Sequence, residues 1–368
     1  MKTKIFTFFF ALVASVGTVL ASDTQVDGIW YNFNSGNNTA SVTFKGSSMG
    51  EYDNEYSGSL TIPSSVTYNG KTYSVTSIGK SAFQQCWNLR YITIPNSVTS
   101  IGEYAFRDCG LYEIEIPSSI TSISNQTFFR CENLTSVTIP NSVTSIGDAA
   151  FMNCSDLLYI TIPHRVTSIE EDAFWYCTSL ISVTIGESVT GIGSRAFDDC
   201  TSLTSVTVYS NAVMTSENMK KTFGEQVQEY IIGEGVTSIN NSAFDGCSYL
   251  VSVTLDKGVA NIGDYAFKGC GRLRNFYNKS TTPQLISANV FENAEVKNCK
   301  LYVPKASIGL YEEEPYWKDF MKILPLEESS IQNMEYPSNV EQIKIIKEGK
   351  VLIKRGDKEY DMTGKEVR

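Results

Sequence analysis

Apolar residues recur along the middle of the chain in a fixed order, Phe-x-x-Cys-x-x-Leu-x-x-Val-x-Ile, as in residues 128–139. The end of this pattern alternates, so Val137 and Ile139 are expected to point into a core while the hydroxyl residues beside them point outward from a strand. Pro140 ends the strand, because proline cannot donate to a ladder. A second short extended segment, 142–147, follows. The Ala-Phe stretch after it is predicted to be one turn of helix or a 3₁₀ corner.

The whole pattern repeats at about 23 residues. Its phenylalanines stand in steps of 23, 22, 23, 23, 23, 47 and 23 residues, at Phe83, Phe106, Phe128, Phe151, Phe174, Phe197, Phe244 and Phe267. The step of 47 contains a degenerate repeat at Phe223, and Phe291 opens a terminal half-repeat. Self-similarity at this period predicts a solenoid, in which each coil buries its apolar face against its neighbours. We expect about ten coils of parallel strands, stacked about 4.8 Å apart.

The motif Phe-x-x-Cys-x-x-Leu-x-x-Val-x-Ile-Pro-x-Ser-Val-Thr-Ser-Ile-Gly-x-x-Ala-Phe resembles the BspA-type leucine-rich repeat of Bacteroides-like bacterial surface proteins, over roughly residues 60–326. The resemblance implies a leucine-rich-repeat rod, displayed outside the cell, that binds host or matrix proteins or other cells. Residues 27–79 resemble the amino-terminal cap of that family, and 301–305 with 316–320 resemble its closing segment. Caps are physically necessary, because an open solenoid end exposes strand edges and core.

The predicted organisation follows from these patterns and from changes in composition. It comprises a signal peptide (1–21), an N-terminal cap with a first irregular repeat (22–79), BspA-type repeats (80–299), a C-terminal cap (300–326), a linker (327–339) and a small β-rich tail (340–368).

The first 21 residues indicate export. Lys2 and Lys4 precede an apolar run that ends in small residues, which is typical of a secretory signal peptide; the alternative is a membrane anchor. We therefore expect an exported protein, extracellular or on the outer cell surface, with no transmembrane span after cleavage.

The tail alternates in a way that predicts small antiparallel hairpins. Residues 360–367 resemble the start of the sorting domains of the type IX secretion route, although the sequence stops before their usual final strand. The resemblance implies export by that route, and a plain structural tail is the alternative.

Residues 209–223 interrupt the regular spacing. Ser216 to Lys221 is expected to form an N-capped helical turn, after which Val227, Tyr230 and Ile232 restore the strand pattern. Such an insertion is either a drifted repeat, which we favour, or a recognition loop.

Nine cysteines in an exported chain raise the question of disulfides. Eight of them share one repeat position, which predicts a buried column of free thiols in which cysteine serves as a small apolar residue. Bridges between neighbouring coils are the alternative, although parallel Cβ directions disfavour them. The ninth, Cys299, has no repeat partner. A metal site is not expected, because the chain has no Cys-x-x-Cys and a single histidine.

Composition argues against most enzymes and against nucleic acid. The 30 Lys and Arg against 40 Asp and Glu give a formal net charge of −10, which repels a phosphate backbone. His164 is the one histidine. The Gly46-Ser47-Ser48-Met49-Gly50 match to a nucleophile motif lacks its strand-turn-helix setting. The carboxylate clusters at 170–172 and 198–199 are explained more simply as solvated corners. We expect no catalysis, no cofactor and no metal.

The outward columns of the predicted sheet are the more informative feature. Most of their positions are Ser or Thr, which form a good polar sheet surface without any ligand. The departures from that background are the candidate ligand-binding residues, because exposed Tyr and Arg are favoured at interfaces. They are Arg90, Tyr91, Tyr112, Glu113, Glu115 and Tyr159.

The sequence therefore favours a non-enzymatic secreted or cell-surface binding and adhesion protein. Its expected partner is a protein or glycan on a host, matrix or neighbouring cell. The alternatives are a glycan-binding accessory module or hydrolase that uses the carboxylates, and a purely structural surface spacer. A hydrolase needs two carboxyl groups about 5 to 10 Å apart in a cleft, which a uniform rod does not offer.

Overall fold

The computed structural model describes residues 24–46, 55–326, 343–347, 350–355 and 358–360. The predicted signal peptide, the linker, residues 47–50 of the nucleophile-like motif and residues 361–367 of the sorting-domain resemblance lie outside these ranges. The described chain is a parallel β-solenoid of about 11 turns, close to the ten expected. It divides into two compact units, residues 1–180 with 191–201 and residues 181–190 with 202–368.

The first unit opens with a mixed sheet that forms its N-terminal end. The strand order is β1-β2-β3-β6-β5, where β1 is Thr24–Val26, β2 is Ile29–Asn34, β3 is Thr39–Thr43, β5 is Ser65–Tyr68 and β6 is Lys71–Ile78. Tyr31 and Val42 bury their side chains beneath it. The strand β8 (Ser100–Ile101) pairs in parallel with β6, so the sheet continues into the first coils.

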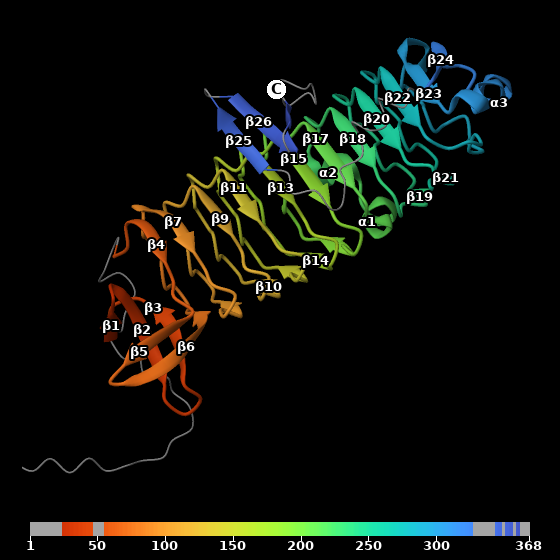
Figure 1. Cartoon of the computed structure of the whole chain (residues 1–368). Coiled ribbons are helices and arrows are strands. Elements are labelled where there is room, and N and C mark those ends of the chain that lie inside the picture. The colour runs from red at the N-terminus through yellow and green to blue at the C-terminus, as the bar shows by residue number, and fades with distance from the viewer. Residues whose placement is uncertain (1–23, 47–54, 327–342, 348–349, 356–357, 361–368) are drawn as a thin grey trace, which may run out of the picture. The chain divides into compact units, whose positions relative to one another are not determined.

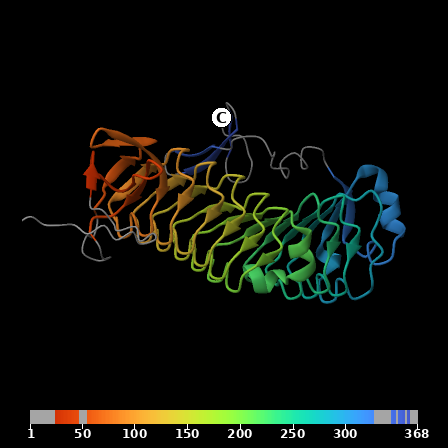
Figure 2. The ribbon, with the colours of Figure 1, turned by 90° about the horizontal axis from the view of Figure 1, so that it is seen from below.

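Each coil of the first unit contributes one strand to each of two separate rows (Figures 1 and 2). One row holds β4 (Gly58–Thr61), β7 (Leu89–Thr93), β9 (Glu113–Glu115), β11 (Ser136–Thr138) and β13 (Tyr159–Thr161). The other holds β10 (Ser122–Ile123), β12 (Ser145–Ile146), β14 (Ser168–Ile169) and β16 (Gly191–Ile192). Pairing is parallel with equivalent residues opposite each other, for example Ser122 beside Ser145, as the repeat predicts. Val137 and Ile139 are only half-buried, whereas Ile114 is fully covered.

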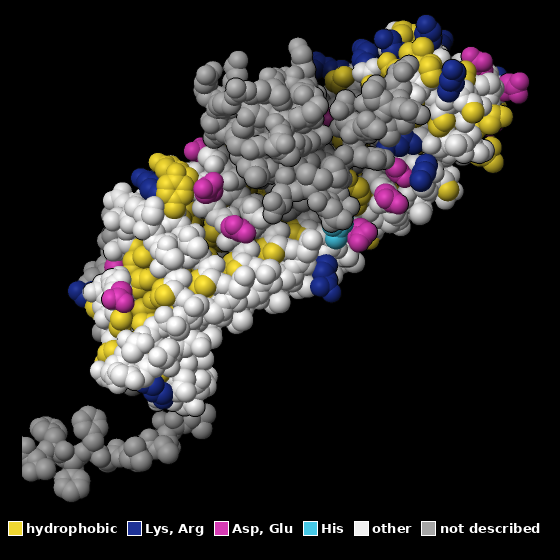
Figure 3. Space-filling model, in the orientation of Figure 1, with side chains coloured by type: hydrophobic (Ala, Val, Ile, Leu, Met, Phe, Trp, Pro, Cys, Tyr) yellow, Lys and Arg dark blue, Asp and Glu magenta, His cyan; other side chains and the backbone are white. Residues whose placement is uncertain are grey.

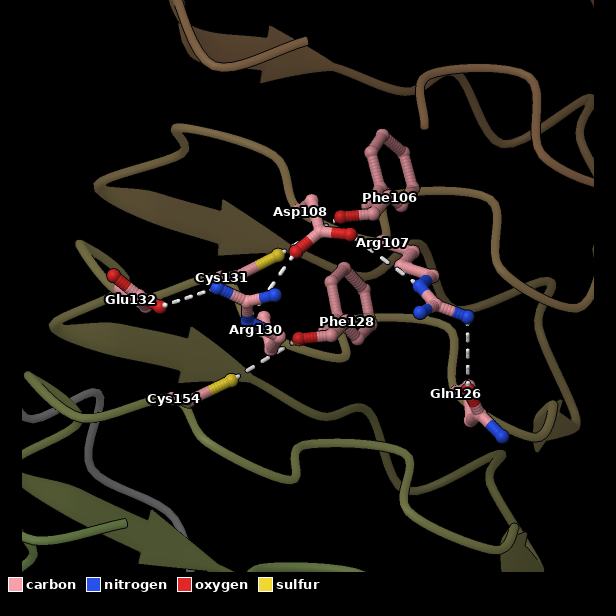
Figure 4. A network of polar contacts seen from close by, with 9 residues as sticks. All are labelled: Phe106, Arg107, Asp108, Gln126, Phe128, Arg130, Cys131, Glu132 and Cys154. Carbon is pink, nitrogen blue, oxygen red and sulfur yellow. Dashed lines mark hydrogen bonds and ion pairs between the residues drawn. The ribbon is translucent and has the colours of Figure 1, made fainter. Parts of the chain in front are cut away.

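Stacked phenylalanines fill the core of this unit. The six rings from Phe83 to Phe197 lie nearly parallel, with neighbouring ring centres 5.1 to 5.3 Å apart. Beside them, the thiols from Cys109 to Cys200 donate to the backbone of an earlier coil, for example Cys131 to the Phe106 carbonyl at 3.0 Å and Cys154 to the Phe128 carbonyl at 3.2 Å (Figure 4). All nine cysteines are buried and unbridged, so the predicted thiol column is confirmed.

The corner that carries each Ala-Phe pair is neither an α-helical nor a 3₁₀ turn, so that prediction is wrong. The residues two before and two after each phenylalanine adopt positive φ, for example Tyr104 at 59° and Asp108 at 55°. This alternation turns every second N–H toward the next coil: Tyr104 donates to Asn125, Phe106 to Thr127 and Asp108 to Phe129. The corner is thus a third ladder between coils, while the alternate N–H groups close turns within the corner, as Ala105 does to Gly102 and Arg107 to Tyr104.

The second unit continues the same scheme. One row consists of β15 (Ser182–Ile185), β17 (Ser205–Val208), β18 (Glu229–Ile232), β20 (Ser252–Leu255), β22 (Asn275–Asn278), β23 (Lys300–Val303) and β24 (Lys322–Pro325), and the other of β19 (Ser238–Ile239) and β21 (Asn261–Ile262). The 3₁₀ turns η1 (Val296–Asn298) and η2 (Lys305–Ser307) and the helix α3 (Ile308–Glu313) lie near its last strands in the sequence. Tyr311 and Trp317 are buried here and close this end with an aromatic cluster around Phe276 and Phe291.

The insertion after Val208 forms two short helices, α1 (Asn211–Ser216) and α2 (Met219–Phe223). Asn218 caps α2 by accepting from the backbone N–H of Lys221, so a capped helical turn is present, beginning slightly later than expected. Met214, Met219 and Phe223 are fully buried. The segment therefore supplies core to its own coil, which favours a drifted repeat over a recognition loop.

The tail contains β25 (Ile343–Lys347), β26 (Lys350–Arg355) and β27 (Lys358–Tyr360), which pair antiparallel in that order. Among the residues that the structure describes, no helix is both long and apolar enough to cross a membrane.

Candidate binding surface

Strands β7 and β9 place four of the six candidate residues on the outer face of the first unit. On β7, Tyr91 is exposed while the next residue, Ile92, is buried. On β9, Glu113 and Glu115 are exposed on either side of buried Ile114. This alternation is the geometric consequence of an extended backbone over an apolar core. Arg90, the fourth of these residues, is half-buried on β7.

A missing residue shapes the surface between these two strands. The segment from Cys109 to Leu111 has one residue, Gly110, where other coils have two, which accounts for the step of 22 in the repeat. A side chain at Gly110 would collide with the carbonyl oxygen of Trp87 and with the guanidinium of Arg90. The sheet of the described residues is also interrupted here, because β7 pairs with β4 and β9 pairs with β11.

Arg90 bridges the two coils at this interruption. Its Nη1 donates to the carbonyl oxygen of Gly110 at 2.9 Å, and its guanidinium carbon lies 5.1 Å from the centre of the Tyr112 ring. The backbone N–H of Tyr112 donates to the carbonyl of Arg90 at 3.1 Å. A guanidinium that stacks on an aromatic face and donates to a carbonyl is well ordered, so Arg90 holds the Tyr112 ring in place.

Tyr91 and Tyr112 form an exposed aromatic pair. Their ring centres are 5.9 Å apart in an edge-to-face arrangement, and the residues are 46% and 40% exposed. In Figure 3, apolar side chains flanked by basic and acidic ones stand out over the part of the solenoid that carries β7 and β9 in Figure 1. Two adjacent tyrosines left open to solvent on a sheet face otherwise rich in Ser and Thr are the main chemical feature of this surface.

The two carboxylates lie beside this pair. The register places Glu113 opposite Ser136 and Glu115 opposite Thr138, so their neighbours on β11 are short hydroxyl residues. Within the part of the chain that the structure describes, neither glutamate makes a side-chain hydrogen bond or an ion pair. Both carboxylates are therefore available to solvent or to a ligand.

Tyr159 lies apart from the other five residues. It occupies the same column as Glu113, but β11 stands between their strands, and Tyr159 is half-buried. The compact cluster brought together by the fold consists of Arg90, Tyr91, Tyr112, Glu113 and Glu115, which we call the tyrosine–glutamate surface.

The corners carry a second set of polar contacts that the sequence alone did not indicate. Asp108 accepts from both Arg107 at 3.3 Å and Arg130 at 3.4 Å, and Arg130 also pairs with Glu132 at 3.4 Å (Figure 4). The guanidinium of Arg107 lies 4.7 Å from the centre of the Phe129 ring. Such partly exposed ion pairs contribute little to stability, and every charged group in this network is already paired.

The acidic clusters singled out in the sequence are also paired on a corner. Arg195 contacts Glu171 at 3.3 Å and Asp172 at 2.9 Å, and the indole N–H of Trp175 donates to Asp199 at 2.9 Å. Burial raises the pKa of the Asp172 carboxyl above its usual value, and the nearby Arg195 offsets only part of this rise. The Glu171 side chain is 57% exposed whereas that of Asp172 is 18% exposed, so the cluster at 170–172 is a solvated corner only in part.

Within the described residues, no group of three or more His, Cys, Asp or Glu side chains is arranged to hold a metal ion. His164 is exposed at the turn that follows Pro163.

Parallel coils of about 23 residues, with two strand rows and a buried leucine in most coils, define a leucine-rich-repeat solenoid. The family model described as BspA type leucine rich repeat region matches residues 51–181 and 219–311, in 6 copies. The match spans more than half of the chain, and the protein belongs to this family. The solenoid of this family is typically a non-enzymatic binding scaffold.

Solved structures that are similar to the chain include the following two. A leucine rich cell surface protein from Faecalibacterium prausnitzii A2-165 is 24% identical, with a TM-score of 0.43, over 86% of this chain and 98% of that one. A leucine-rich repeat protein from Bacteroides ovatus ATCC 8483 is 22% identical, with a TM-score of 0.36, over 83% of this chain and 100% of that one. No curated protein matches the chain.

Proposed function

We propose that the protein is an exported, non-enzymatic binding protein that presents the tyrosine–glutamate surface to a protein on a host cell, in a matrix or on a neighbouring cell. The family supplies the scaffold, a repeat-based solenoid whose strands and corners carry exposed side chains on a rigid core. The basic and apolar start of the chain and its resemblance to bacterial surface proteins support export.

The observation that carries this proposal is the exposed Tyr91–Tyr112 pair. Tyrosines supply large, rigid contact area at low conformational cost and are enriched in binding hot spots. Here the pair is ordered before any partner arrives, because Arg90 stacks on Tyr112 and Tyr112 contacts Tyr91. A surface that is already ordered loses less entropy on binding.

The test measures saturable binding of the protein to arrayed matrix proteins and glycans at physiological salt. Tyr91→Ala removes half of the aromatic pair, and Tyr176→Ala is the matched control, because Tyr176 is 48% exposed on a corner of the same unit. We expect binding to a protein component that weakens about tenfold or more with Tyr91→Ala and changes little with Tyr176→Ala.

The remaining outcomes point elsewhere. Equal loss in both variants, or retention in Tyr91→Ala, would place the contact on another surface. Binding to glycans alone would favour an accessory glycan-binding module, and the absence of any saturable ligand would favour a structural spacer. Turnover of a glycan that is abolished by replacing Glu113 and Glu115 would identify a hydrolase.

A further inference from the structure

Arg90 is the basic side chain of the tyrosine–glutamate surface, and its charge is already engaged. The guanidinium donates to the Gly110 carbonyl and lies against the Tyr112 ring, and the residue is half-buried. A guanidinium held in this way orders the surface but is poorly placed to meet an anionic group of a partner. The surface therefore offers a ligand two aromatic rings and the two carboxylates of Glu113 and Glu115.

The two carboxylates are spaced like alternate residues of an extended chain. Glu113 and Glu115 point to the same side of β9, so their positions are about 7 Å apart along the strand. Ser136 and Thr138, their neighbours on β11, carry uncharged hydroxyl groups and so leave both carboxylate charges unpaired on that side. In an extended peptide segment that lies along β9, every second side chain would have the same spacing as Glu113 and Glu115.

Arginine and lysine side chains fit this combination. A carboxylate binds a guanidinium through charge-assisted hydrogen bonds, and an exposed tyrosine ring attracts a cation on its face. The formal net charge of −10 adds a longer-range attraction for a basic partner and a repulsion for anionic glycans. Aromatic contact area and charge complementarity thus select the same class of ligand.

We infer that the tyrosine–glutamate surface binds an extended, arginine- or lysine-rich segment of a partner protein. The inference rests on the proposed function and adds to it the chemistry of the partner. The Tyr91–Tyr112 pair supplies the apolar and cation–π contacts, and Glu113 and Glu115 supply the ion pairs.

The experiment compares two short peptides, one that alternates arginine and serine and one in which citrulline replaces every arginine, for binding to the full chain. The variant Glu113→Gln with Glu115→Gln removes the two charges with little change of shape. Its matched control is Asp156→Asn with Glu170→Gln, because both side chains are exposed in the same unit and make no ion pair within the described residues.

We expect the arginine peptide to bind, more weakly as salt is raised, and the citrulline peptide not to saturate. The loss of two carboxylate contacts should weaken the binding of the arginine peptide about tenfold. The control variant has the same net charge as the double glutamine variant and should weaken this binding less than about twofold. No binding of the arginine peptide, equal binding of the citrulline peptide, or equal loss in the control variant would overturn the inference.

These results separate the inference from the proposed function. An arrayed protein that loses binding with Tyr91→Ala but not with the double glutamine variant would leave the binding surface in place and remove its preference for basic partners. An array without any saturable ligand would refute the proposed function itself.

Discussion

The guanidinium carbon of Arg90 lies 5.1 Å from the centre of the Tyr112 ring, one coil further along the solenoid. Both residues flank the place where the repeat is one residue short and where the described strand ladder is interrupted between β7 and β9. The bond from Arg90 to the Gly110 carbonyl crosses this interruption. The irregular coil is therefore joined to its neighbour by this side-chain bond together with the backbone bond from the Tyr112 N–H to the Arg90 carbonyl.

Gly110→Ala should destabilise the protein strongly. The added methyl group would overlap the Trp87 carbonyl and the Arg90 guanidinium, so the two coils must separate. We expect a loss of about 2 to 4 kcal/mol in the free energy of unfolding, measured by urea denaturation. Gly191→Ala in the same unit is the control, because nothing lies within 4 Å of its added Cβ. Equal stability of the two variants would show that the close approach at Gly110 is not maintained.

Arg90→Lys should also destabilise the protein, although the charge is kept. Lysine cannot reproduce a planar group that stacks on Tyr112 while it donates to Gly110. A loss of about 1 to 2 kcal/mol is expected from the hydrogen bond and the stacking together. Arg165→Lys, at an exposed position of the same unit, should change the urea midpoint very little. A similar small change in both variants would contradict the role of Arg90 as a bridge between coils.

Stability should fall as the pH rises above about 9. Burial raises the pKa of the Cys131 thiol to about 12 and that of Cys200 to about 12, from an ordinary value of 9.0. Tyr31 is raised from 10.0 to about 12, chiefly by burial. The unfolded chain ionises these groups first, so between about pH 9 and pH 12 the folded state binds more protons and unfolding becomes easier.

Each such thiol is expected to cost about 1 kcal/mol of stability at pH 10, and nothing at pH 7. The measurement is the urea midpoint at a series of pH values in a reducing buffer. A midpoint that stays constant from pH 8 to pH 11 would show that the thiols are not buried as neutral groups.

The repeat and its core were predictable because they depend on residues that cannot vary freely. Phe128 stacks between two identical rings, and Cys131 fits a slot closed on all sides, so the same residue types return in each coil. The conformation of the corner was not predictable in this way. In the first unit its left-handed positions carry residues such as Gln85, Asp108 and Arg130, so the usual glycine signal for positive φ is missing there, although Gly246 and Gly269 occupy the equivalent position in the second unit.

The candidate surface was predictable only in part. Alternation along a strand was enough to expect Tyr91, Glu113 and Glu115 on the outer face, and the structure places them there. The engagement of Arg90 by Gly110 was not visible in the sequence, because it depends on how a one-residue deletion brings two coils together. The half-burial of Tyr159 likewise depends on its surroundings and not on its place in the column.

Successive corners of the first unit hold Asp108, Arg130 and Asn153 at one equivalent position, with an acidic, a basic and an amide side chain. Each joins the next coil through its backbone N–H, to the carbonyls of Phe129, Met152 and Trp175, and the Asp108–Arg130 ion pair only adds to these bonds. The main chain therefore keeps the coils together whatever the side chain is. During evolution, the side chains at this corner position are therefore free to change. Related proteins with the same core are able to expose unrelated surface chemistry to the same environment.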